Sequence, residues 1–135
     1  MRLTRLAAIL LALATSACAG AAPTNRGDKF KGDQGQIAQL VDDLAQAGSR
    51  GDANKICSDI LAKQLVDELK RAGGDCVTEM DRAIKDASDY DLQVVTVKIS
   101  GTTATAQVRQ GDNGKVASFS FVKEKAGWRA SALGG

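Results

Sequence analysis

The hydrophobic period of the chain changes once, at about Asp91, and this change limits the fold more than any other feature of the sequence. Before it, apolar residues recur at steps of three and four, as in Ile37, Leu40, Val41 and Leu44, which is the spacing of one helical face. After it, apolar and polar residues alternate, and Val, Ile, Thr and Phe are enriched, as in strands. Helices followed by strands predict an α+β domain and not alternating βαβ units.

The helical half divides into four expected pieces. The first opens at Asp33 or Gln34 and ends at Gly48, because glycine commonly ends helices. The others are a short turn over 52–57 with Asp52 as N-cap, a longer helix from Ser58 or Asp59 to 73–74, and a helix from Cys76 to about Ala87. The longer helix is expected to carry Ile60, Leu61, Leu65 and Leu69.

The alternation of apolar and polar residues in the second half of the chain predicts four antiparallel strands. Val95, Val97 and Ile99 alternate with polar residues, and alternation returns over 103–109 and 116–122, with Phe119 and Phe121 on one face. A last strand runs from Trp128 to about 133, and turn signals at 101, 112–114 and 127 separate the strands. We therefore expect helices that cover one side of a twisted four-stranded sheet.

The N-terminus has the pattern of an export leader. Arg2 and Arg5 precede an uncharged apolar run over 6–14, which is shorter than the roughly 20 residues that span a bilayer and fits the apolar region of a signal peptide. The sequence predicts a signal peptide over 1–17. Residues 19–32 are small and polar without an apolar period, so we interpret them as a flexible tether.

The residues around Cys18, Thr15-Ser16-Ala17-Cys18-Ala19-Gly20, resemble the lipobox of bacterial lipoproteins. The resemblance implies that Cys18 becomes a lipidated N-terminus and that residues 18–32 tether an exported domain to the extracytoplasmic side of a cell membrane. Thr15 departs from the pattern, which usually has a large aliphatic residue three places before the cysteine. The alternative is ordinary cleavage after Ala19, which would release a soluble secreted protein without Cys18.

Cys57 and Cys76 are expected to form a disulfide. The chain has three cysteines, and assigning Cys18 to the lipid leaves this pair for an oxidising compartment. A metal pair or a redox couple is the alternative, but the chain has no histidine and the two cysteines lack the CxxC spacing that both would favour. We therefore predict a structural bridge and no metal site.

Several short segments together resemble small exported bacterial lipoproteins of the nuclear transport factor 2-like superfamily, including the lumazine-binding-like branch. They are Gly51-Asp52-Ala53, Ala72-Gly73-Gly74-Asp75-Cys76 and the stretch from Val122 to Arg129. The resemblance covers about 37–133 and implies that residues 33–135 form a cone, in which helices pack on the concave side of a curved sheet. Because such cones include enzymes, ligand binders and inert modules, the resemblance does not supply the function.

The sequence favours a protein that is not an enzyme. The chain lacks histidine, the commonest general base, and it has no nucleophile elbow and no phosphate-binding loop, so we assign no catalytic residue and no cofactor. The alternative is an isomerase or hydratase that uses an Asp in the cone, and Asp89, Tyr90 and Asp91 are the candidates. Local capping between helix and sheet, or simple solvation, is the favoured role of these three residues.

The remaining predictions concern partners. Without residues 1–17 the chain has 16 basic and 16 acidic residues, a net charge of 16 − 16 = 0, and their interspersion argues against nucleic acid as a partner. Phe119, Phe121 and Trp128 are candidates to line a ligand pocket, although core packing is the more common role of such residues. We expect a membrane contact through the lipid anchor, and a small molecule or an envelope protein as partner. The pocket is expected to have aliphatic, Thr and aromatic walls.

Overall fold

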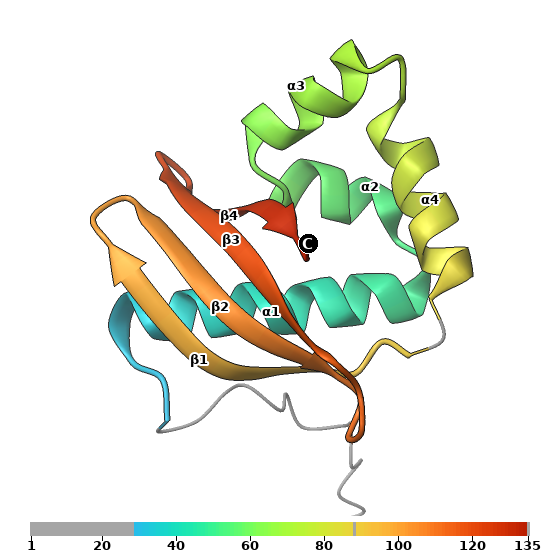
Figure 1. The fold of residues 1–135 in the computed structure, drawn as a ribbon. Coiled ribbons are helices and arrows are strands. Elements are labelled where there is room, and N and C mark those ends of the chain that lie inside the picture. Colours follow the sequence, from blue (N-terminus) through green and yellow to red (C-terminus); the bar gives the residue numbers. More distant parts are fainter. Residues whose placement is uncertain (1–28, 88, 135) are drawn as a thin grey trace, which may run out of the picture.

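The computed structural model describes residues 29–87 and 89–134. Most of the N-terminal region, including the expected leader, Cys18 and the tether up to residue 28, lies outside these residues, and those predictions are not addressed by the structure. The described chain folds into helices followed by an open four-stranded antiparallel sheet (Figure 1). The predicted α+β class is confirmed.

The described part of the helical half contains four α-helices and one π-helical turn. They are α1 (Gly32–Arg50), α2 (Ala53–Lys55), η1 (Ile56–Ile60), α3 (Lys63–Arg71) and α4 (Cys76–Asp86). The strands are β1 (Leu92–Ser100), β2 (Thr103–Gln110), β3 (Val116–Glu124) and β4 (Gly127–Leu133), and they lie side by side in this order.

α1 extends beyond its predicted end. Gly51 has a φ of 68°, which a glycine adopts without a Cβ clash, and its backbone N–H donates to the carbonyl of Gly48 at 3.1 Å. The expectation that Gly48 ends the helix was therefore wrong. Gly48 lies inside the last turn, where a Cβ would come within 3.1 Å of the ring of Tyr90, so its smallness serves packing.

The segment after α1 also differs from the expected long helix. Asp52 caps α2 as predicted, because its Oδ1 accepts a 3.0 Å hydrogen bond from the Lys55 backbone N–H. The chain then widens into η1, where the Leu61 N–H donates to the Ile56 carbonyl at 2.9 Å. Leu61 next forms a parallel bridge with Ala130 of β4, and α3 starts only at Lys63. Burial of this segment against β4 thus overrides its helical spacing.

The predicted disulfide is present. Cys57 in η1 and Cys76 at the start of α4 are bonded, with a Cα–Cα distance of 6.1 Å across a sequence separation of 19. α3 and α4 are joined by a turn in which Gly73 has a φ of 85°, so the chain changes direction between the two helices. The bridge therefore joins η1 to the first residue of α4 and encloses α3 and the turn after it, and this α3–α4 corner rises above the sheet in Figure 1.

The sheet follows the predicted alternation with one shift. Val94 pairs with Val108 and both are buried, but a β-bulge between Val94 and Thr96 changes the register of the following residues. Val94 and not Val95 therefore enters the core, which corrects the first part of the predicted strand. Phe119 and Phe121 share the inner face of β3, as expected.

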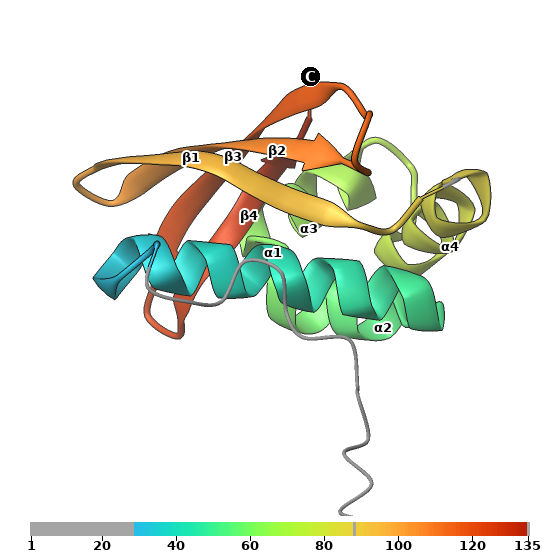
Figure 2. The ribbon, with the colours of Figure 1, turned by 90° about the horizontal axis from the view of Figure 1, so that it is seen from below.

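The helices lie on one face of the sheet, as Figure 2 shows from below. α1 contacts both edge strands, β1 and β4, so the sheet curves around it. Side chains from α1, η1 and all four strands form a common core, whose largest fully buried members are Ile37, Val41, Ile60 and Val108. Within the described ranges, no helix is both long and apolar enough to cross a bilayer.

Candidate functional site

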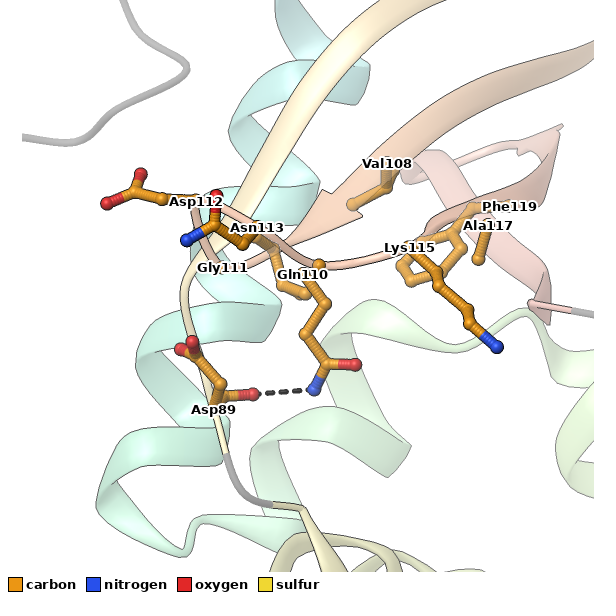
Figure 3. Close-up of a pocket in the computed structure, with 11 residues that line it drawn as sticks. Asp89, Val108, Gln110, Gly111, Asp112, Asn113, Lys115, Ala117 and Phe119 are labelled. Atoms are coloured by element: carbon orange, nitrogen blue, oxygen red, sulfur yellow. Dashed lines mark hydrogen bonds between the residues drawn. The ribbon is translucent and has the colours of Figure 1, made fainter.

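A hollow of about 590 Å³ opens at the end of the sheet where β2 turns into β3 (Figure 3). We call it the sheet-end hollow. Its floor consists of the inner-face side chains Leu92, Val108, Ala117 and Phe119, and its rim of Asp89, Gln110 and the turn 111–115. An apolar floor with a few polar groups at the rim is the usual construction of a small-molecule site.

Two glycines allow the 111–115 turn to fold over this floor. Gly111 has a φ of 72°, and its N–H donates to the Asp91 carbonyl at 2.8 Å, which fixes the turn to the start of β1. A Cβ on Gly111 would meet the carboxylate of Asp89, and one on Gly114 would overlap the backbone of Gln110. The predicted turn signal at 112–114 is therefore a steric requirement of the rim.

The polar side chains of the rim differ in whether they already form hydrogen bonds or ion pairs. Asp89 Oδ1 accepts a 2.8 Å hydrogen bond from the Asp91 N–H, and Asp112 Oδ1 accepts one of 3.1 Å from Gln93 Nε2. In Figure 3 the Asp112 carboxylate points away from the floor residues, whereas the Lys115 side chain extends on the side of Ala117 and Phe119. Lys115 forms no ion pair or hydrogen bond through its side chain with any residue in the described ranges.

A smaller hollow of about 140 Å³ adjoins the first on the helix side, and we call it the helix-side hollow. Its walls are almost wholly apolar and come from α1, η1, α4 and β4 as well as from the start of β1: Leu44, Ala45, Gly48, Ile56, Met80, Ala83, Ile84, Ala87, Tyr90, Leu92 and Leu133. Tyr90 is held there because its hydroxyl donates a 2.6 Å hydrogen bond to the Ile84 carbonyl near the end of α4.

The two hollows share three wall residues, Asp89, Leu92 and Gln110. Gln110 Nε2 donates a 2.7 Å hydrogen bond to the Asp89 carbonyl, the dashed line in Figure 3, so a single polar contact lies on the wall between them. Six apolar side chains around the hollows are only half-buried: Leu44, Met80, Ile84, Leu92, Phe119 and Leu133. The two hollows therefore form one amphipathic region.

A third hollow, of about 530 Å³, lies beside the disulfide between α3 and the β3–β4 turn. Glu124 Oε1 accepts a 3.0 Å hydrogen bond from the Lys63 N–H at the start of α3, which satisfies one of the free N–H groups at this helix end. The hydrogen bond from Lys63 to Asp67 lowers the pKa of this exposed carboxyl and raises the pKa of Lys63. The Glu124 contact therefore joins the start of α3 to the end of β3, whereas the Lys63–Asp67 pair lies within α3.

The three aromatic candidates have different positions. Phe119 lines the sheet-end hollow, but Phe121 and Trp128 are 2% and 4% exposed and line none of the three hollows. Lys123 Nζ lies 5.7 Å from the centre of the Trp128 ring and 3.4 Å from Asp33 Oδ2 of α1. Phe121 and Trp128 therefore belong to the core between sheet and helices.

The predicted composition of the pocket wall was wrong, because ionisable residues stand at its rim. Asp89, Asp112 and Lys115 line the sheet-end hollow, all three exposed. Asp89 accepts a hydrogen bond from the Asp91 N–H and Tyr90 donates one to the Ile84 carbonyl, contacts that agree with the capping interpretation of this segment. The one buried charged residue of the described part is Asp42 on α1, at 4% exposed, and it lines none of the three hollows.

The missed residues of the site are those that distant contacts bring together. Gln110 and Lys115 carry no sequence signal that separates them from ordinary surface residues, whereas 112–114 was visible as a turn. Among the described residues, no group of three or more His, Cys, Asp or Glu side chains suits a metal ion. Comparisons with family models, with curated proteins and with solved structures find no match to this chain.

Proposed function

We propose that this chain is an exported envelope lipoprotein, anchored through Cys18 after removal of 1–17. Its domain over 33–135 would be a non-catalytic binding module of the nuclear transport factor 2-like kind that holds a small amphipathic ligand. Helices on the concave side of a curved sheet support this fold, because α1 contacts both edge strands. The binding site in this proposal is the sheet-end hollow together with the helix-side hollow.

The observation that carries the proposal is the convergence of six half-buried apolar side chains, from α1, α4, β1, β3 and β4, on one region. The other half-buried apolar side chains that pack against the core line neither of these hollows: Phe30, Cys57, Leu65, Val66, Leu69 and Ile99. A volume of about 590 Å³ falls within the range of about 300 to 1,000 Å³ typical of ligand sites. A ligand with an apolar body and a polar end would cover the floor and reach the rim.

A binding role is favoured over an isomerase or hydratase role by the state of the carboxylates. An enzyme of that kind needs a carboxylate in an apolar setting that shifts its pKa and aims it at the substrate. Asp89 is exposed and already accepts a backbone hydrogen bond, and the buried Asp42 lines neither hollow.

A thermal-shift screen of small amphipathic molecules tests the binding proposal, since a ligand of the folded state raises the unfolding midpoint by mass action. Ala117→Trp places a large side chain in the hollow, and Ser118→Trp places the same side chain on the opposite, exposed face of β3. We expect hits whose stabilisation is lost in A117W and retained in S118W. Hits whose stabilisation survives in A117W would overturn the proposed site, whatever their behaviour in S118W.

Mass spectrometry of the membrane fraction tests the anchor. The proposal expects a mature chain that begins at a lipid-modified Cys18. An unmodified chain that begins at Gly20, released from the membrane, would overturn the anchor while leaving the binding proposal standing.

A further inference from the structure

We infer that the ligand class of this site is a small apolar anion, namely an aryl or short alkyl group that carries a carboxylate. The apolar group would enter the helix-side hollow and the carboxylate would meet Lys115 at the rim. This inference rests on the proposed binding function and adds the chemistry of the ligand.

The size of the helix-side hollow sets the apolar part. It measures about 140 Å³, and its wall is apolar apart from groups at its boundary with the larger hollow. An apolar cavity of about 150 Å³ in a protein holds one benzene-sized molecule. The compartment therefore matches a single ring or a short alkyl group and is too small for a long acyl chain.

The charge of the ligand follows from which charged side chains of the rim lack a hydrogen-bond or ion-pair partner. Both carboxylates of the rim already accept hydrogen bonds, Asp89 from Asp91 and Asp112 from Gln93, and Asp112 points away from the floor. Lys115 extends on the floor side and has no side-chain partner in the described ranges. A negative group over the floor would therefore meet an unpaired ammonium.

The charge of the surrounding sheet agrees with this polarity. Residues 92–134 contain six basic and two acidic residues, a net charge of 6 − 2 = +4. Residues 29–91 contain nine basic and thirteen acidic residues, a net charge of 9 − 13 = −4. The hollow takes its floor and its 111–115 rim from the positive half, and Lys115 is the rim group that would attract an anion, whereas Asp89 and Asp112 at the same rim remain negative.

Three probes separate the two parts of the inference in titration calorimetry: 3-phenylpropionate, propionate and 3-phenylpropylamine. The ring should raise the affinity of 3-phenylpropionate about tenfold or more above that of propionate, because it removes apolar surface from water. The amine keeps the ring and reverses the charge, so it should bind more weakly than the acid. An amine that binds as tightly as the acid would overturn the assigned charge.

Two pairs of variants place the groups. Lys115→Glu should lower the affinity for 3-phenylpropionate about fivefold and raise the affinity for the amine. The control is Lys98→Glu on the outer face of β1, which changes the charge by the same amount. Ala45→Leu fills the helix-side hollow, so it should lower the affinity for 3-phenylpropionate to that for propionate and leave the affinity for propionate unchanged. The control is Gln46→Leu at the exposed neighbouring position.

The outcomes distinguish this inference from the function on which it rests. The ligand class is wrong if A45L still binds 3-phenylpropionate more tightly than propionate. It is also wrong if K115E and K98E change the affinity for 3-phenylpropionate equally. The proposed binding function would still stand if A117W abolishes the stabilisation by hits of the wider screen. If A117W changes nothing for any hit, the binding function itself is wrong.

Discussion

The backbone carbonyl of Asp89 accepts a 2.7 Å hydrogen bond from Nε2 of Gln110, a residue 21 positions later in the chain. This contact joins the link between α4 and β1 to the end of β2. Both residues line the two hollows, so the contact also fixes the shape of the candidate site. Its removal should change stability and site geometry together.

Gln110→Ala should lower the free energy of unfolding by about 1 kcal/mol, the usual contribution of one hydrogen bond. Gln107→Ala is the matched control, because Gln107 donates a 3.2 Å hydrogen bond to Ser118 on the outer face of the sheet and lines neither hollow. Urea denaturation measures both. Amide exchange at Gly111 and Leu92 should accelerate in Q110A and remain unchanged in Q107A. Equal exchange in the two variants would show that the contact does not order the rim.

Gly111→Ala should destabilise the protein more than Gly101→Ala. Both glycines have positive φ, 72° and 59°, so each substitution carries a conformational cost of about 1 kcal/mol. Only at Gly111 would the new Cβ also meet the Asp89 carboxylate, because nothing lies within 4 Å at Gly101. Adding Asp89→Ala should partly rescue G111A in thermal denaturation. An equal loss of stability in the two single variants would contradict the close packing of the rim.

How far the sequence predicts this protein depends on the range of the interactions involved. The α+β class, the four strands, the capping by Asp52 and the disulfide follow from local periodicity, side-chain chemistry and cysteine parity, and the structure confirms them. The π-helical turn at Ile56–Ile60 leads directly into the bridge between Leu61 and Ala130, where the Ala62 N–H donates to the Ala130 carbonyl, and no local pattern reports this distant partner.

The site was less predictable than the fold for the same reason. Phe119, Phe121 and Trp128 are equally aromatic in sequence, but only Phe119 lies far enough toward the sheet end to escape coverage by the helices. The bulge after Val94 likewise changes which residues of β1 face inward. Cavities depend on where packing between distant elements is incomplete, and a sequence pattern records only which residues prefer burial.

Replacing both Cys57 and Cys76 with Ser should lower the free energy of unfolding by about 3 kcal/mol, because a loop of 19 residues is no longer closed in the unfolded chain. The loss should concentrate in the α3–α4 corner, which the bridge joins to η1. Guanidinium denaturation measures it, with reductant as a second route. Reductant should destabilise the wild type and leave the double variant unaffected. An unchanged wild type under reducing conditions would contradict the role of the bridge.

Tyr90→Phe should lower the free energy of unfolding by about 1 kcal/mol, since it removes the hydroxyl that donates to the Ile84 carbonyl. The ring remains against Gly48, so ligand binding in the helix-side hollow should persist in Y90F. Tyr90→Ala should reduce both stability and binding. A loss of binding in Y90F with unchanged stability would point to a chemical role for the hydroxyl and against simple capping.

The most direct test of the account is a ¹H–¹⁵N spectrum of the protein titrated with 3-phenylpropionate. Saturable shifts are predicted at the amides of Leu92, Gln110, the 111–115 turn and Phe119, which surround the sheet-end hollow. The amide resonances of Thr105 and Ser120, which face outward on β2 and β3, should not shift. Shifts that saturate on this outer face, or no saturable shift around the hollow, would contradict the claim that the hollow is the ligand site.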